Sequence, residues 1–294
     1  MSGVWIAMYA CFCAGPIILE NSAIRIEVDP QLFSVQFAGF PGGANFMERL
    51  LVEEEARAGS GWVDPGGLVT DVFPAPEREA VLRRGPASVE FQDAHSVILL
   101  GPVSEKLGVR MKKELRLEGD EAKARYTVTL LAQSQESKRY SVRNTVRVPL
   151  RSTIRVEKEK TEILPLAGLE KLAPVVVRSM NYWLIPVPPT SSVNKAVLGA
   201  AVLSFSLENR SGFWKRTIEK ATAEDATPDN ATPFFCVLDD ATRSYGAALQ
   251  SASQDVSLGA PLVFTESWEF VHRGTIKEEK PEKTEKEPAD EKKE

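Results

Sequence analysis

The chain has 294 residues, 43% of them hydrophobic, so it is long enough to bury a sizeable core. Its formal net charge of −5 at pH 7 argues against nucleic acid as a partner, because a phosphate backbone is normally met by a basic surface. Its 3 cysteines and 2 histidines exclude a disulfide-stapled scaffold and a structural zinc site built from four cysteines, or from two cysteines and two histidines in finger spacing. No metal and no cofactor is expected.

The N-terminal stretch from Val4 to Ile18 is apolar apart from small residues. It is too short to span a bilayer, but it fits the hydrophobic region of a signal peptide, although the usual basic start is missing. We expect residues 1–16 to be a signal peptide or apolar leader of an exported protein, periplasmic or extracellular. The alternative is an N-terminal β-strand of a cytoplasmic protein. No other segment is long and apolar enough for a transmembrane helix, so an integral membrane protein is not expected.

Alternation of apolar and polar residues dominates the chain, most clearly over residues 24–29, 109–117, 125–130 and 142–148. A period of two is typical of antiparallel strands with one face on a core and the other in water. Glu118-Gly119-Asp120 predicts a hairpin turn, and Gly101-Pro102 also indicates a turn. The best helix candidate is residues 46–58. Roughly fifteen short strands and few short helices predict an all-β fold, a large antiparallel β-sandwich.

Residues 17–275 are expected to form this one sandwich domain, with the proline-rich piece from Ile185 to Pro189 as a rigid loop inside it. From Lys277 onward the chain carries 6 lysines, 7 glutamates and 1 aspartate and almost no apolar side chain. Such a segment buries too little surface to offset the entropy of ordering it. Residues 276–294 are therefore predicted to be a disordered, charged tail that solvates or tethers the domain.

Local catalytic signatures are absent: the sequence has no nucleophile elbow, phosphate-binding loop or zinc-binding helix motif. The strand-like segment around residue 268 gives a weaker hint. Glu266 and Trp268 share one strand face, and Glu269 lies on the other. An aromatic ring beside a carboxylate suits a sugar ring and its hydroxyls. The alternative is that Trp268 is a core residue.

Other candidates are aromatic and polar residues at loop edges, where sandwich proteins build their sites. Trp62 and Asp71 flank a glycine-rich turn, and Asn181 and Trp183 precede the proline-rich piece. The predicted ligand-binding set is Trp62, Asp71, Asn181, Trp183, Glu266 and Trp268, with ordinary packing under loops as the alternative for each. No catalytic residue is assigned. The candidates for acid or base chemistry are Asp71, Glu266 and His272.

The stretch from Ile17 to Pro30 resembles the first hairpin of galactose-mutarotase-like (aldose epimerase-like) proteins, and it is followed by a glycine turn and Asn45, as in that group. The segments 245–251, 258–261 and 266–270 resemble the end of an uncharacterised bacterial branch of the same superfamily. The resemblance covers residues 17–273. It implies a β-supersandwich, which agrees with the strand count.

Enzymes of this superfamily interconvert sugar anomers, with a glutamate as base, a histidine as acid and a second histidine that binds the sugar. By resemblance, Gln250 stands where the base is expected, and the region 144–147 stands where a histidine is expected but contains none. A glutamine side chain takes up no proton at neutral pH, so base catalysis at this position is lost.

Three hypotheses follow. The first is a non-catalytic protein that binds carbohydrate or another component of the cell envelope, motivated by the resemblance, the missing base and the leader. The second is a divergent sugar-acting enzyme, an epimerase, lyase or hydrolase. The third is a structural scaffolding domain. Fold alone does not choose among them.

Overall fold

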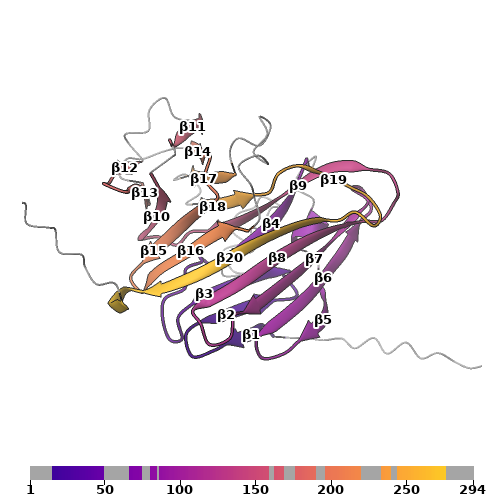
Figure 1. Cartoon of the computed structure of the whole chain (residues 1–294), viewed down its shortest axis with the longest axis horizontal. Coiled ribbons are helices and arrows are strands. Elements are labelled where there is room, and N and C mark those ends of the chain that lie inside the picture. Colours follow the sequence, from indigo (N-terminus) through magenta and orange to yellow (C-terminus); the bar gives the residue numbers. More distant parts are fainter. Residues whose placement is uncertain are drawn as a thin grey trace, which may run out of the picture.

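The computed structural model describes residues 15–49, 66–74, 80–84, 86–158, 162–168, 176–189, 196–219, 233–239 and 244–275. Trp62, the charged tail and nearly all of the leader lie outside these residues. So does most of the helix expected over 46–58, of which the described residues 46–49 are not helical. Within the described chain, two antiparallel sheets pack face to face (Figure 1).

The first sheet, called sheet I, has ten strands, with β19 pairing β9 beside the main path. Its path runs through β1 (Ile17–Glu20), β2 (Arg25–Asp29), β3 (Ser34–Gly39), β4 (Leu68–Phe73), β9 (Lys138–Arg147), β18 (Ser244–Gln250), β17 (Phe234–Asp239), β14 (Ala196–Ala200) and β11 (Leu164–Ala167), and β19 spans Gln254–Val256.

The second sheet, called sheet II, also has ten strands. Its path runs through β12 (Val177–Arg178), β13 (Tyr182–Val187), β10 (Ser152–Glu157), β15 (Ser204–Asn209), β16 (Gly212–Ile218), β20 (Leu262–His272), β8 (Lys123–Ala132), β7 (Val109–Leu117), β6 (Ser96–Ser104) and β5 (Ser88–Gln92). The described helices are short, α2 (Ala80–Arg84) and the 3-10 helix η3 (Arg273–Thr275). Neither is long and apolar enough to cross a membrane.

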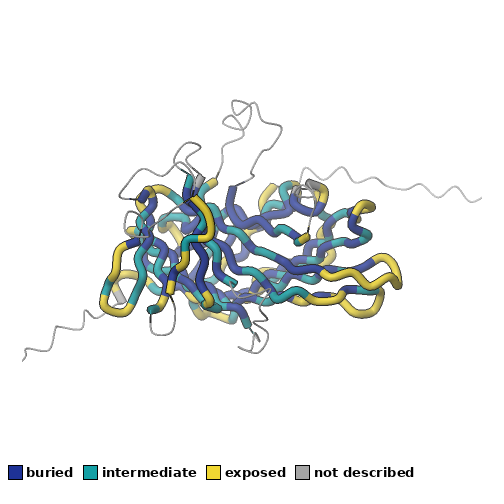
Figure 2. Tube along the Cα trace, turned by 90° about the horizontal axis from the view of Figure 1, so that it is seen from above, coloured by how far each residue is buried: buried dark blue, intermediate teal, exposed yellow. Residues whose placement is uncertain are grey.

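The predicted all-β sandwich is confirmed. Along β7 and β8 buried and less buried residues alternate, and the inward set contributes to one core cluster shared by both sheets. Figure 2 shows buried segments in dark blue and intermediate ones in teal throughout the two sheets. The hairpin predicted at Glu118-Gly119-Asp120 is confirmed, because β7 and β8 pair across it from Leu117 and Ala124.

Two local predictions are wrong. Gly101-Pro102 is not a turn but an irregularity inside β6, where the register with β7 shifts between Leu100 and Val103. The position needs glycine because a Cβ on Gly101 would lie 2.7 Å from the Phe33 ring.

The proline-rich piece is likewise not all loop, since Ile185 to Val187 belong to β13. Among the described residues, β12 pairs with β13 at Trp183 and Leu184 and not at Pro186, so the missing N–H of Pro186 is tolerated on that side of the strand.

Candidate functional site

The position where resemblance expects a catalytic base lies on the outer face of sheet I, the face turned away from sheet II. Gln250 ends β18 and pairs in register with Arg143 of β9, which in turn pairs with Asp71 of β4. These three half-buried side chains therefore form one row across three neighbouring strands. Alternation places the next residues along β4 and β9, Thr70 and Asn144, inward.

The guanidinium of Arg143 is the centre of this row. Its Nε donates a hydrogen bond of 2.7 Å to Oε1 of Gln250. Its central carbon lies 4.4 Å from the ring centre of Phe73 and 4.0 Å from that of Phe235, which are cation–π distances. Phe235 is two strands away, and the small outward residue Ala248 lies between them on β18. Arg143 therefore extends across the sheet surface toward β17.

The carboxamide of Gln250 is oriented from both ends. Its oxygen accepts from Arg143, and its Nε2 donates to the hydroxyl of Ser141 at 3.2 Å. The two hydrogen bonds fix the orientation of the carboxamide, with its oxygen toward Arg143 and its nitrogen toward Ser141. The group at the expected base position is thus a neutral amide that holds an arginine in place.

A second arginine completes the group. Arg83 of α2 places its Nε 3.1 Å from Oδ1 of Asp71, and their side chains are 5% and 14% exposed. The ion pair fastens α2 to β4 and orients the carboxylate of Asp71. We call the set Asp71, Phe73, Arg83, Ser141, Arg143, Phe235 and Gln250 the Arg143 site.

Glu266 and Trp268 are not at a surface cleft, contrary to the first sequence hypothesis and in agreement with its alternative. Both are 0% exposed in the core between the sheets. Glu266 accepts hydrogen bonds from Nε and Nη2 of Arg216 at 2.8 and 2.9 Å, and from Trp268 Nε1 at 3.1 Å. Asn144 Nδ2 donates to the same carboxylate at 2.8 Å. A ligand arriving from solvent does not meet these groups.

Arg216 is the residue that sequence reasoning missed. It is 0% exposed and lies on the inward face of β16 with Trp214 and Ile218. The sequence pattern that could have predicted an inward Arg216 is its alternation with these two apolar residues. It is weak, because Phe213 on the opposite face makes both faces of the strand look partly apolar.

The buried polar network continues from Asn144 to sheet II. Thr70 donates to Oδ1 of Asn144 at 2.8 Å, and its hydroxyl lies 3.3 Å from that of Tyr126. Burial raises the pKa of the Tyr126 phenol, so it stays protonated. Thr70 and Asn144 are the sequence neighbours of Asp71 and Arg143, so the network fixes the two strands that carry the Arg143 site.

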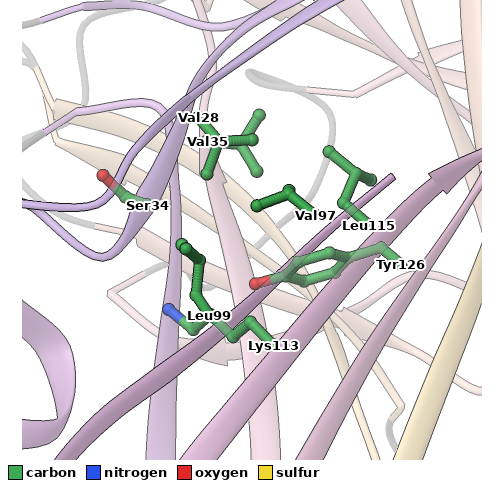
Figure 3. Close-up of a pocket in the computed structure, with 8 residues that line it drawn as sticks. All are labelled: Val28, Ser34, Val35, Val97, Leu99, Lys113, Leu115 and Tyr126. Atoms are coloured by element: carbon green, nitrogen blue, oxygen red, sulfur yellow. The ribbon is translucent and has the colours of Figure 1, made fainter. Parts of the chain in front are cut away.

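Lys113 of β7 is a further buried polar group. It lines a small cavity, about 10 Å³, with Ser34 and Tyr126 among the surrounding side chains (Figure 3). Its Nζ donates to the carbonyl of Phe33 at 2.5 Å and lies 3.9 Å from the centre of that ring. Burial lowers the pKa of Lys113 to about 7, although the charge of Asp71 acts in the opposite direction.

The remaining candidates lie elsewhere. Trp183 is half-buried in β13 of sheet II, with its ring centre 4.9 Å from the guanidinium of Arg178, and Asn181 is exposed just before it. His272 ends β20 and contacts Phe40 at 5.0 Å between ring centres. Asp71, Glu266 and His272 therefore occupy an outer face, the core and a strand end, and the structure does not bring them together as an acid–base set. The described residues contain no cluster of three potential metal ligands.

Two large antiparallel sheets with this topology define the chain as a β-supersandwich. Comparison with solved structures gives the particular fold, that of galactose-mutarotase-like proteins. A putative aldose 1-epimerase from Klebsiella pneumoniae superimposes with a TM-score of 0.58 at 11% identity, over 86% of this chain and 78% of that one. A putative aldose 1-epimerase from Escherichia coli K12 gives 0.55 at 9% identity, over 88% and 99%.

A galactose mutarotase-like protein from Lactobacillus casei gives 0.55 at 10% identity, over 87% of this chain and all 100% of that one. No protein-family model and no curated protein sequence matches the chain. Sequence identities of 9–11% to these structures show a shared fold and say nothing of a shared function. The function must be argued from the Arg143 site.

Proposed function

We propose that this protein binds carbohydrate at the Arg143 site without transforming it, as a non-catalytic member of a fold that elsewhere includes putative epimerases. The proposal includes an exported protein of the cell envelope, in keeping with the apolar N-terminal leader.

The observation that carries the proposal is the carboxamide of Gln250. It occupies the expected base position and is held by Arg143 at 2.7 Å and Ser141 at 3.2 Å. An amide in this state neither accepts nor releases a proton at neutral pH, so it supplies no general base. The chain's two histidines do not compensate, because His95 lies in the β5–β6 turn and His272 at the end of β20.

The chemistry of the site suits a sugar. The half-buried rings of Phe73 and Phe235 add apolar surface on either side of the Arg143 guanidinium, which is a planar group of N–H donors. Asp71 adds a carboxylate acceptor whose orientation is set by Arg83. Aromatic surface with a few oriented polar groups is the usual composition of a small-molecule site.

A thermal-shift screen of the full chain against neutral sugars, sugar acids and sugar phosphates tests the proposal. A ligand at ten times its dissociation constant stabilises the folded state by about 1.4 kcal/mol, which raises the melting temperature by about 2 °C or more in a domain of this size. We expect such a shift in the wild type and its loss in Arg143→Met.

Arg155 provides the matched control. It lies 4.2 and 4.5 Å from the ring centres of Tyr182 and Phe213, but it belongs to sheet II. Arg155→Met removes the same kind of stacked guanidinium from a different surface, so it should keep the shift. A screen without any shift, or a shift that survives in Arg143→Met, contradicts the proposal.

A further inference from the structure

A hollow lies on the outer face of sheet II, on the side of the sandwich opposite the Arg143 site, where β5 and β7 end and β6 begins. Its volume is about 480 Å³, and its lining includes Phe91, His95, Ile98, Glu114 and Arg116. Figure 1 shows β5 at the edge of this sheet. None of these side chains belongs to the Arg143 site.

The floor of the hollow follows from strand register. Phe91 pairs with Ile98, and Ile98 pairs with Glu114, so the three side chains form a row across β5, β6 and β7. With neighbouring strands roughly 4.8 Å apart, the row is about 10 Å long. Phe91 is 48% exposed, which is high for a phenylalanine that alternation places beside two other outward side chains.

A second pair of outward side chains, on β6 and β7, borders the hollow on one side. Ser96 of β6 pairs with Arg116 of β7, two residues along from Glu114. A guanidinium and a carboxylate thus stand side by side on β7, beside the apolar strip of Phe91 and Ile98. Donor, acceptor and apolar surface are all present in a length of about 10 Å.

The end wall is rigid. Oδ1 of Asp93 accepts hydrogen bonds from the backbone N–H groups of His95 and Ser96 at 2.8 and 2.6 Å. These bonds, with the His95 amide as the largest cause, lower the pKa of Asp93 and keep it ionised. The amide of Leu117 donates to the carbonyl of His95 at 2.8 Å and ties the turn to β7. The hollow is therefore formed before any ligand arrives.

We propose that this hollow is a second carbohydrate site, one that binds a neutral pyranose chain with a sugar ring stacked on Phe91. Glu114 accepts from, and Arg116 donates to, hydroxyl groups of the sugar. Among the described lining residues, Asp93 and Glu114 outweigh Arg116 by one negative charge when His95 is neutral, which disfavours acidic glycans. This inference does not depend on the proposed function of the Arg143 site.

Saturation-transfer NMR on the full-length protein with maltohexaose, cellohexaose and N-acetylchitohexaose tests the inference. At least one of these neutral probes should bind saturably. Phe91→Ala should weaken that binding by about fivefold or more, since stacking on the ring is lost. The strand is exposed along its whole length, so this variant should fold as the wild type does.

Val89→Ala is the matched control. Val89 lies on the same strand and is 41% exposed, but it pairs with the inward-facing Leu99, so it lies on the other face. Val89→Ala should bind as the wild type does. The inference is overturned if no probe binds, if Phe91→Ala binds equally well, or if Phe91→Ala changes only self-association in sedimentation runs. Binding lost in Arg143→Met but kept in Phe91→Ala supports the Arg143 site and overturns this one.

Discussion

Two polar groups lie on opposite faces of β4 and β9, and they differ in how their charges are satisfied. In the core, the carboxylate of Glu266 receives four hydrogen bonds from Arg216, Asn144 and Trp268, all fully buried. On the outer face, a neutral amide of Gln250 holds a half-buried Arg143 between two rings. The first group is closed off from solvent and structural. The second has side chains that a ligand can reach.

The largest expected effect comes from breaking the core group. Arg216→Met leaves the Glu266 carboxylate buried without its cation, which should lower the free energy of unfolding by about 3–5 kcal/mol. Urea denaturation at pH 7 measures this loss in the free energy of unfolding. The double variant Arg216→Met with Glu266→Leu should recover much of the loss, because a hydrophobic replacement of a buried pair is often nearly neutral. A single variant as stable as the wild type would show that the pair is not enclosed.

The next effect concerns Lys113, whose pKa is about 7 in the folded protein against an ordinary value of 10.5. Between these two values the unfolded chain binds more protons than the folded one, so Lys113 makes stability rise with pH. Between the two pKa values, Lys113 raises the free energy of unfolding by about 1 kcal/mol per pH unit. At lower pH its effect on the free energy of unfolding is constant.

Lys113→Met removes this dependence. The difference in unfolding free energy between variant and wild type should be largest, in favour of the variant, near pH 7 and should shrink toward pH 10. Urea titrations at four pH values across this range give the comparison. A difference that does not change with pH would mean that the amine is solvated in the folded state.

A smaller effect is expected from Gln250→Glu, which makes the outer group resemble the core group. A carboxylate against Arg143 forms a charge-assisted bond, worth about 1 kcal/mol or less at a half-exposed position. The gain should be present at pH 7 and absent at pH 3, where the new carboxyl is protonated. Glutamate alone should not create an epimerase, since no histidine faces this row. Faster anomer exchange by Gln250→Glu would contradict that reasoning.

The sequence predicted the strands and their pairing in the β7–β8 hairpin because period-two alternation is local. It also predicted that Glu266 and Trp268 share a face, but alternation does not say which face is the core when both sides carry apolar residues. The contact of Arg143 with Gln250 joins residues 107 positions apart. Such a pair depends on sheet order, which no local pattern contains.

The Gly101-Pro102 dipeptide is another case in which a local pattern has a tertiary cause. Gly101-Pro102 was interpreted as a turn, since the dipeptide marks turns. In the structure its cause is tertiary, the Phe33 ring that fills the space of a Cβ at 2.7 Å. Lys113 lies in the inward set of β7 with Met111 and Leu115, a position where alternation leads one to expect an apolar side chain.

The central claim is binding without turnover at the Arg143 site, and one NMR titration of full-length protein with galactose labelled with ¹³C at C1 tests it most directly. The same spectra report binding, from the shift of the anomeric signals, and turnover, from the exchange between them. We predict a saturable shift that is lost in Arg143→Met and kept in Arg155→Met, with exchange no faster than in buffer. Accelerated exchange in the wild type, or binding unchanged in Arg143→Met, would contradict the account.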